Sequence, residues 1–471
     1  MASNVSFSGI ASGIDTESLI SSTLESMRST KVNPKQEKVT ELQSENAALD
    51  ELKTMIQTFK DTVSKFSTLN GGVVEQSAVS TDESILSGTA SKNASNSSYF
   101  VQVNQLARNA SYSLISEGKY TSSNATIASS LAGSETFSME IGDPNVLKTV
   151  NVSIDSSTTL SDFVMNFNSQ AQGYATASVV NRGTESDPDY IVMVSCNSSG
   201  EEKGIKSVTI PTALTSAGVW TPTKCVEIKG RNAELSVNGV SISRPSNTVS
   251  DIISGLTLNL SSEGTATISV ENDIDKTTSN IQDFIDAYND IVKYIEENNE
   301  VTRDDSGSEV TNVYGSLAKV SIDNDFLNNI KANMSQAKNT AGTAVAIFAD
   351  LGVKTNRDGT LEFNSDDLQK ALTNDASGVN TVVTSFADTA AMTGGTIDQY
   401  VRYNGLIDIS INSNETQIKD LNDRISRAET QIAQREASLR AQYANFETLM
   451  GRLQSQSSSI TSILAGMTAS H

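Results

Sequence analysis

The strongest pattern in this chain is a seven-residue spacing of large apolar residues near its C-terminus. Eight successive positions follow it: Ile411, Ile418, Ile425, Ile432, Leu439, Phe446, Leu453 and Ile460. This spacing keeps one stripe of a slightly under-wound helix turned towards a partner helix. It predicts a helix of about 50 residues, about 75 Å long at 1.5 Å per residue. A single helix of that length forms no compact core, so we expect a partner helix or further copies of the chain.

The positions three residues further along each heptad are only half apolar. Four are apolar and four are polar: Leu421, Ala428, Leu449 and Ile463 against Asn414, Arg435, Gln442 and Gln456. An ordinary long helix packed on its own domain is the alternative reading. A membrane-surface helix is disfavoured, because six Lys and Arg balance six Asp and Glu from Ile411 onwards and leave no basic face.

A second heptad pattern lies near the N-terminus and begins after Pro34. Its apolar positions are Leu42, Leu49, Leu52, Ile56, Phe59, Val63 and Phe66. The glycines at Gly71 and Gly72 are typical of a helix end. Before Pro34, we expect a short helix that is capped by Asp15 or Thr16 and carries Leu19, Ile20, Leu24 and Met27. A long heptad helix near each end of one chain suggests that the two ends pack together.

Between these ends the apolar period changes from about 3.5 to two. Strands are predicted at 99–103, 150–154, 174–180, 190–194, 235–237, 240–242, 256–260 and 265–270. Asn238-Gly239 lies between two of them and is a strong signal for a two-residue hairpin. The region from Val73 to about Asn272 therefore predicts one or two antiparallel β domains.

Helical spacing returns at Ile274 and continues through Ile281 to Ile295, with another helix around Phe326–Ile330. A small hairpin turning at Asp358-Gly359 follows, and then a helix capped by Asn364 or Ser365. The hairpin has a superficial likeness to a calcium-binding loop. Lys354 and Ser365 occupy the positions where that loop needs Asp and Glu, so we interpret it as a plain turn. The fold class predicted is α+β, with several domains.

Composition and charge exclude several kinds of function. The 471 residues allow about three domains. The chain carries 34 Lys and Arg against 56 Asp and Glu, a net charge of −22, which argues against nucleic-acid binding. His471 is its one histidine, so no catalytic Ser/His/Asp or Cys/His set is available and a zinc site is disfavoured. Neither an enzyme nor a cofactor is expected. Cys196 and Cys225 could form a disulfide, although two free thiols are the expected state.

The N-terminal sequence shows no secretory signal, and no run of 18 apolar residues predicts a membrane span. We therefore expect no membrane insertion.

Five short motifs occur in a characteristic order. They are Ser8-Gly9-Ile10-Ala11-Ser12-Gly13-Ile14-Asp15, Val101-Gln102-Val103-Asn104-Gln105-Leu106-Ala107, Leu235 to Gly239 leading to Gly255 to Leu260, Phe284-Ile285-Asp286-Ala287-Tyr288-Asn289, and Leu351-Gly352-Val353 with Asp358-Gly359-Thr360-Leu361. The ordered set resembles the flagellar hook-associated protein 2 family, which caps the bacterial flagellar filament. In addition, residues 159–173 and 190–200 are similar to a short β module shared with flagellins.

The resemblance implies a nested domain order. Residues 1–33 and 419–471 would form a terminal helical layer that is mobile until assembly. Residues 34–73 and 272–418 would form a helical leg. Residues 74–108 and 230–271 would form one β domain, and 109–229 a second, inserted one. The assembly seam would use the heptad positions of both terminal regions, from Leu49 to Phe66 and from Ile411 to Ile460.

By the same resemblance, copies of the chain form a homo-oligomeric cap, usually a pentamer, at the distal tip of the filament. The cap keeps exported flagellin from escaping and promotes its folding and insertion. Flagellin, other hook-associated proteins and a type III export chaperone are the implied partners, and the protein is exported to the flagellum. A surface adhesin that acts through the β domains, or a junction protein between hook and filament, are the alternatives.

Overall fold

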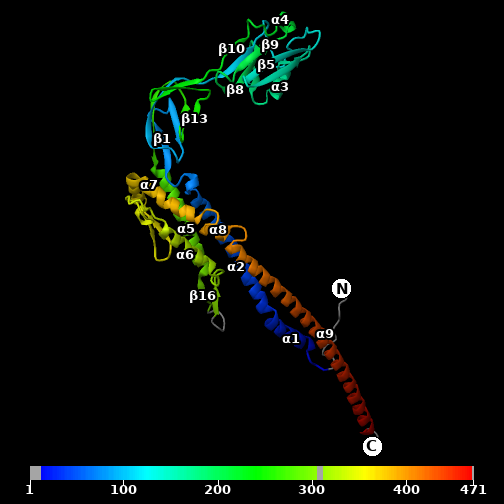
Figure 1. Ribbon diagram of the computed structural model, residues 1–471. Coiled ribbons are helices and arrows are strands. Elements are labelled where there is room, and N and C mark those ends of the chain that lie inside the picture. Colours follow the sequence, from blue (N-terminus) through cyan, green and yellow to red (C-terminus); the bar gives the residue numbers. More distant parts are fainter. Residues whose placement is uncertain (1–11, 305–310, 469–471) are drawn as a thin grey trace. The chain divides into compact units, whose positions relative to one another are not determined.

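The computed structural model describes residues 12–304 and 311–468, and the chain divides into two compact units (Figure 1). One unit joins Met1–Val73 to Thr278–His471, and the other is Val74–Thr277. The first is mainly helical and the second mainly β. The sequence predicted this alternation of helical, β and helical regions, and the α+β multidomain fold is confirmed.

The helical unit is built from long helices with two small hairpins between them. Its elements are α1 (Thr16–Lys31), α2 (Asn33–Ser64), η1 (Thr68–Asn70), α5 (Ile274–Asn299), β16 (Val301–Asp304), β17 (Thr311–Tyr314), α6 (Ile322–Gln336), η2 (Phe348–Leu351), β18 (Val353–Thr355), β19 (Leu361–Phe363), α7 (Ser365–Ala390), α8 (Thr396–Val401) and α9 (Leu406–Thr468). The helix predicted from Ile411 begins five residues earlier and runs for 63 residues.

Local sequence explains where several of these helices begin. Asp15 caps α1, because its side chain accepts a hydrogen bond of 3.0 Å from the backbone N–H of Ser18. Pro34 lies in the first turn of α2, where a missing N–H costs nothing. Asn364 caps α7 through the backbone N–H of Asp366. The predicted starts of these three helices are confirmed.

An aromatic cluster forms the core of the helical unit. Phe59 of α2 stacks on Phe284 of α5 with ring centroids 5.5 Å apart, and Phe326 of α6 meets Phe59 edge-on at 6.4 Å. Phe386 of α7 meets Phe284 at 5.7 Å. Each of these rings is nearly inaccessible to solvent. The apolar stripe of α2 is therefore covered within the chain by α5, α6 and α7.

The β unit has two separate hydrophobic cores. The first lies between a five-stranded and a three-stranded antiparallel sheet, in the orders β1-β15-β3-β11-β12 and β13-β14-β2. Its strands are β1 (Glu75–Ser80), β2 (Leu86–Ala90), β3 (Ser97–Gln105), β11 (Ala233–Val237), β12 (Val240–Arg244), β13 (Thr248–Ile253), β14 (Leu256–Leu260) and β15 (Gly264–Asp273). Asn238 and Gly239 connect β11 to β12 with φ of 48° and 85°, the backbone that the predicted hairpin requires.

The second core joins a four-stranded sheet, β10-β4-β8-β7, to a three-stranded one, β6-β5-β9. The elements are β4 (Asn109–Leu114), β5 (Glu135–Asp143), β6 (Val146–Ile154), α3 (Leu160–Ala171), β7 (Ala175–Asn181), β8 (Tyr190–Ser199), β9 (Ile205–Thr209), α4 (Thr212–Ser216) and β10 (Val226–Ile228). Trp220 packs against Phe163 at its centre, with ring centroids 4.8 Å apart.

Helix α3 covers one edge of each sheet in this second core. The Asn168 side chain bonds the backbone N–H and C=O of Ala177 in β7, at 2.7 and 3.0 Å. Gln170 does the same for Asn151 in β6, at 3.1 and 2.6 Å. Each amide takes the place of a further strand and protects the edge from pairing with another chain.

The two cores follow the ranges 74–108 with 230–271 and 109–229 that the family resemblance implied. That these ranges fold as separate domains stays a prediction. The expected boundary at 272 falls inside β15, which continues to Asp273, because its ladder with β1 pairs Asp273 with Glu75.

Both cysteines are free in the structure. Cys196 lies in β8 and Cys225 directly precedes β10, and β4 lies between these two strands. Two strand spacings amount to about 9.6 Å, which is beyond the reach of a disulfide. Burial raises the pKa of the Cys196 thiol to about 11 and also raises that of Cys225.

We therefore predict two unpaired thiols with slow reactivity. Few thiolates form at pH 8 when the thiol pKa is raised, so native protein should react with iodoacetamide far more slowly than denatured protein. Mass spectrometry after alkylation in denaturant should find both cysteines labelled without prior reduction. An intramolecular disulfide in protein purified without reductant would contradict this prediction.

Candidate assembly surface

Helix α9 runs antiparallel to α1 and α2, which follow one another along it (Figure 1). The side-chain contacts between α9 and these two helices keep one register from Asp408 to Glu447. Near the start of α9, Asp408 pairs with Lys53; further along, Glu429 pairs with Arg28 at 3.5 Å. Arg440 then meets Glu17, and Glu447 accepts hydrogen bonds from Ser12. The prediction that the two ends of the chain pack together is confirmed.

A buried polar group fixes this register on the α2 side. Asn414 is 6% exposed, and its side-chain amide donates to Oε1 of Glu45 at 2.7 Å and to Oδ1 of Asn46 at 2.9 Å. Its heptad position is one of those that interrupt the apolar stripe. A buried Asn in such a seam typically costs stability and specifies alignment, since any other register leaves its amide without partners.

A shielded ion pair connects α2 to α8. Lys60 Nζ lies 2.8 Å from Oδ1 of Asp398, whose side chain is 8% exposed. The hydrogen bond from Lys60, followed by one from the backbone N–H of Gly394, lowers the pKa of the Asp398 carboxyl. The charged carboxylate therefore stabilises the fold.

Helix α1 covers the middle of the α9 stripe. Ile20 and Leu24 of α1 form one small core with Ile432 and Leu439, which are 1% and 7% exposed. Around this core, Arg440 makes a two-fold contact with Glu17 at 2.6 and 2.8 Å. That contact lowers the pKa of Glu17 and raises that of Arg440, although the pair is open to solvent and contributes little to stability.

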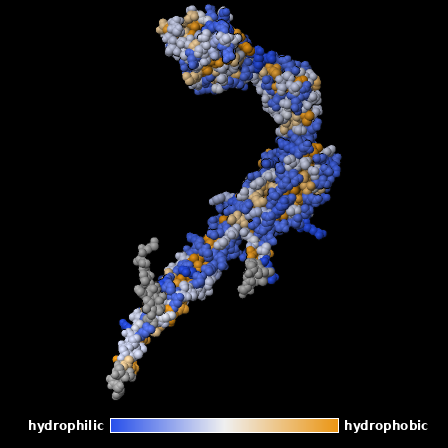
Figure 2. Space-filling view, turned by 180° about the vertical axis from the view of Figure 1, so that it is seen from behind, coloured by the Kyte–Doolittle hydropathy of each residue, from blue (hydrophilic) through white to orange (hydrophobic). Residues whose placement is uncertain are grey.

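Beyond Leu439 the apolar stripe of α9 becomes exposed. Phe446, Leu453 and Ile460 are 37%, 50% and 58% accessible, and Leu449 and Ile463 on the neighbouring row are 55% and 63% accessible. Figure 2 shows hydrophobic residues in orange along this part of the helix. We call these five residues the outer stripe. A row of apolar side chains of this length on one helix face is typical of an interaction surface.

The structure thus divides the predicted seam into three parts. Leu49, Leu52, Ile56, Phe59, Val63 and Phe66 lie in the core of the helical unit and are at most 1% exposed. Ile411, Ile418, Ile425, Ile432 and Leu439 are half-buried or buried beside α2 and α1. Phe446, Leu453 and Ile460 belong to the outer stripe. Because the first set has almost no accessible surface, we keep the assembly interpretation for the outer stripe, and it stays a prediction.

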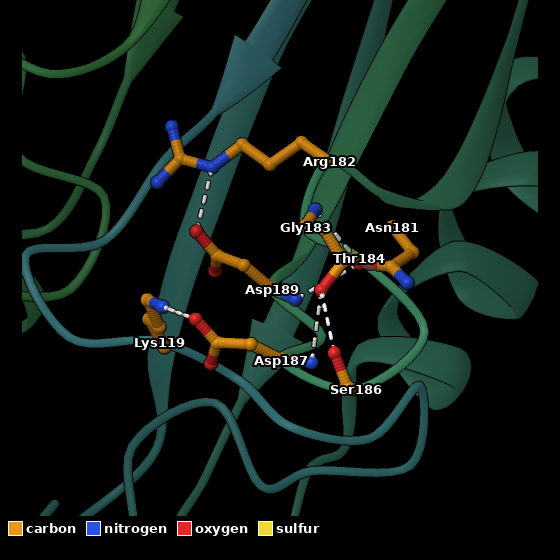
Figure 3. Close-up of polar contacts among 8 residues, drawn as sticks. All are labelled: Lys119, Asn181, Arg182, Gly183, Thr184, Ser186, Asp187 and Asp189. Atoms are coloured by element: carbon orange, nitrogen blue, oxygen red, sulfur yellow. Dashed lines mark hydrogen bonds and ion pairs between the residues drawn. The ribbon is translucent and has the colours of Figure 1, made fainter.

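Sequence reasoning missed the ordered loop between β7 and β8 (Figure 3). Oδ1 of Asn181 accepts from the backbone N–H groups of Gly183 and Asp189, both at 2.9 Å. Arg182 pairs with Asp189 at 2.7 Å, and Lys119 pairs with Asp187. The charges that shape this loop are therefore satisfied among themselves. The Asn181-x-Gly spacing was the signal that could have found it.

The described residues contain no group of three or more His, Cys, Asp or Glu side chains arranged to hold a metal ion. Asp358 and Gly359 form the turn of the β18–β19 hairpin, as the sequence predicted. None of the helices in the described part of the chain has the length and apolar character needed to cross a membrane.

The chain combines paired terminal helices with antiparallel β sheets that are inserted between them in the sequence. Two sequence families match it. Residues 12–110 match "Flagellar hook-associated protein 2 N-terminus", and residues 230–455 match "Flagellar hook-associated protein 2 C-terminus". The chain belongs to the flagellar hook-associated protein 2 family, as its motifs indicated.

Relatives of known name support this over nearly the whole chain. The A-type flagellar hook-associated protein 2 of Pseudomonas aeruginosa is 28% identical over 99% of this chain and 98% of its own length. The flagellar hook-associated protein 2 of Escherichia coli K12 is 24% identical over 97% of both. The crystal structure of domains D1-D2-D3 of the flagellar cap protein FliD from Escherichia coli shares the fold. It gives a TM-score of 0.59 and 22% identity, and covers 78% of this chain and 99% of its own.

The Lys60–Asp398 pair predicts a pH-dependent contribution to stability. Because the pKa of Asp398 is lowered in the folded state, its contribution is present above the unfolded value of about 3.9 and is lost as pH falls through the folded value. Asp398→Asn should therefore lower the free energy of unfolding at pH 7 by about 1–3 kcal/mol. The difference should shrink below pH 4. Asp420→Asn, which removes an exposed i,i+4 pair with Arg424, is the control and should change little. Equal effects of the two variants at pH 7 would contradict the prediction.

Ile432→Asp should separate α1 from α9. Ile432 is 1% exposed, and burying a carboxylate at its position costs several kcal/mol. In concentrated, self-associated protein, hydrogen exchange of the α1 amides should rise at least tenfold, while the amides of the β unit stay protected. Ala433→Asp adds the same charge on the solvent-facing side of α9 and serves as the control. Unchanged α1 protection in Ile432→Asp would be inconsistent with the packing described here.

Proposed function

We propose that this protein caps the distal end of a bacterial flagellar filament. The observation that carries the proposal is the match of both its terminal regions, 12–110 and 230–455, to the same flagellar family. The cap structure from Escherichia coli supports it at the level of the fold. The protein acts by contact and by steric closure, holding exported flagellin at the tip and giving it a place to fold and insert. Its location is the distal tip of the flagellar filament.

Capping requires several copies to act together, and the outer stripe is the contact that we assign to assembly. Each side chain of the outer stripe gains up to about 1.5–3 kcal/mol when a partner covers it fully. Ordering the backbone of a helix end costs about 1–2 kcal/mol per residue, and the five side chains help to offset this cost only when a partner is present. We propose a homo-oligomer, with the pentamer of the family as its form.

Polar residues keep this contact reversible. Gln442 and Gln456 alternate with Leu449 and Ile463 on one heptad row, so the outer stripe is weaker than a uniform apolar zipper. A cap must release and re-form contacts as each flagellin subunit inserts. A seam of intermediate strength suits that cycle better than a permanent one.

The remaining partners follow from the proposed function. Flagellin is the partner on which the cap acts, by contact alone. Other hook-associated proteins are also partners at the tip, where they precede the cap. Export proceeds through the flagellar type III channel with a dedicated chaperone. We also propose that the terminal layer, in its described parts 12–33 and 419–468, is mobile in the free subunit and becomes ordered on assembly; the rest of the ranges 1–33 and 419–471 lies outside the described residues. The contacts of α1 with α9 then form part of the assembled state.

A pair of matched variants tests the outer stripe in a strain that lacks the gene. Ile460→Asp with Ile463→Asp should fold and be exported, yet leave short filaments and unpolymerised flagellin in the medium. Ser458→Asp with Thr461→Asp places the same charges on the opposite face of α9 and should restore filaments of normal length. Immunogold labelling of the control should mark filament tips. Full complementation by the first variant would refute the role of the outer stripe, and label at the hook–filament junction would refute capping.

A further inference from the structure

The helical unit contains a groove lined by three lysines, which is unusual in a chain of net charge −22. Lys331, Lys338 and Lys354 surround a cavity of about 610 Å³. Its apolar wall consists of Met334, Ile347 and Phe348, and Ile347 is 40% exposed. We call this site the lysine groove.

Two of these lysines form no close ion pair. Lys331 lies beside the β18–β19 turn, where its charge acts on Asp358. Lys338 and Lys354 are exposed and form no ion pair with any described residue. Glu362 faces Lys354 across the β18–β19 ladder, yet the two side chains form no ion pair within 4.0 Å. The lysine groove therefore presents two lysines without a close ion-pair partner beside an apolar wall.

A second groove has the opposite charge. It has a volume of about 730 Å³ and is lined by Glu296, Glu297 and Glu300 at the end of α5, together with Asp358. Ile295 and Leu327 provide its apolar wall, and Lys293 is the one cation among its described lining residues. We call this site the acidic groove.

One residue that lines the acidic groove has a buried oxygen without a donor. Oδ1 of Asn299 accepts no hydrogen bond from the described residues. The Asn299 side-chain amide donates to Oδ2 of Asp323, which is fully buried and does not line the groove.

Both grooves lie along one face of α6. Asn324 and Leu327 line the acidic groove, and Lys331, Met334 and Ser335 line the lysine groove. These five positions follow one another at intervals of three, four, three and one, so they form a single stripe of the helix. One subunit therefore carries a negative and a positive docking site along the same helix, each next to apolar surface.

We propose that the acidic groove of one subunit binds the lysine groove of a second copy of this chain. The inference rests on the homo-oligomer proposed above and names a contact within it. Two copies of so acidic a chain repel each other wherever carboxylates meet, and complementary patches are where they attract. The apolar walls supply the buried area, while the charges select the orientation of the pair.

Charge-reversed variants of the full-length protein test this contact. Lys338→Glu with Lys354→Glu makes both grooves acidic, and Glu297→Lys with Glu300→Lys makes both basic. Each variant alone should self-associate at least tenfold more weakly than the natural protein in sedimentation velocity at low salt, because like charges then meet. An equimolar mixture of the two should regain association, since acidic and basic grooves face each other again. Lys224→Glu with Lys229→Glu carries the same charge change in the β unit and should associate normally.

The outcomes separate this contact from capping itself. Thermal unfolding of every variant verifies that it is folded. The inference is overturned if either charge variant associates like the natural protein, if the mixture stays dissociated, or if the natural protein is monomeric at all concentrations. If the lysine variant associates normally but fails to cap filaments, the lysine groove binds another partner. That result would also overturn the inference. In each of these cases filament length in the deletion strain still decides whether the protein is a cap.

Discussion

The antiparallel register of α9 against α1 and α2 is the constraint on which the helical unit depends. Buried Asn414 sets it, because only in this alignment does its amide reach Glu45 and Asn46. A slip of one heptad would take that amide away from both acceptors, at a cost of about 1–3 kcal/mol. The same alignment brings Arg440 to Glu17 and buries Ile432, so the exposed outer stripe begins where the cover from α1 ends.

Periodicity in the sequence was sufficient to predict most of this fold. The terminal helices, their pairing and the Asn238-Gly239 hairpin all carry local signals that tertiary packing did not override. Helix α3 was missed because it interrupts a region dominated by alternating strands. Its signal was present, since Thr159 and Asp162 form a capping box at its first turn. The β16–β17 hairpin has only four residues in each strand and no pattern that distinguishes it from a loop.

The candidate site was predicted less completely, for a physical reason. A heptad repeat identifies which side chains share a helix face, but it does not tell what covers them. Phe59, Ile432 and Phe446 are equivalent in the sequence pattern, yet one lies in an aromatic core, one under α1 and one in solvent. Burial depends on the neighbours in space, and those come from segments hundreds of residues away. The sequence pattern did not reveal the two charged grooves, because their residues come from several separate elements, among them α5, α6 and the β18–β19 hairpin.

Charge explains why assembly contacts in this protein are restricted to a few places. The formal charge of −22 makes most approaches between copies unfavourable, and salt screens this repulsion only beyond about 8–10 Å. Close contact therefore requires surfaces that are apolar and nearly neutral, or surfaces whose charges are opposite. The outer stripe satisfies the first condition, since Lys and Arg equal Asp and Glu from Ile411 onwards. The lysine and acidic grooves satisfy the second. Acidity elsewhere on the chain then acts against misdirected association while leaving these contacts available.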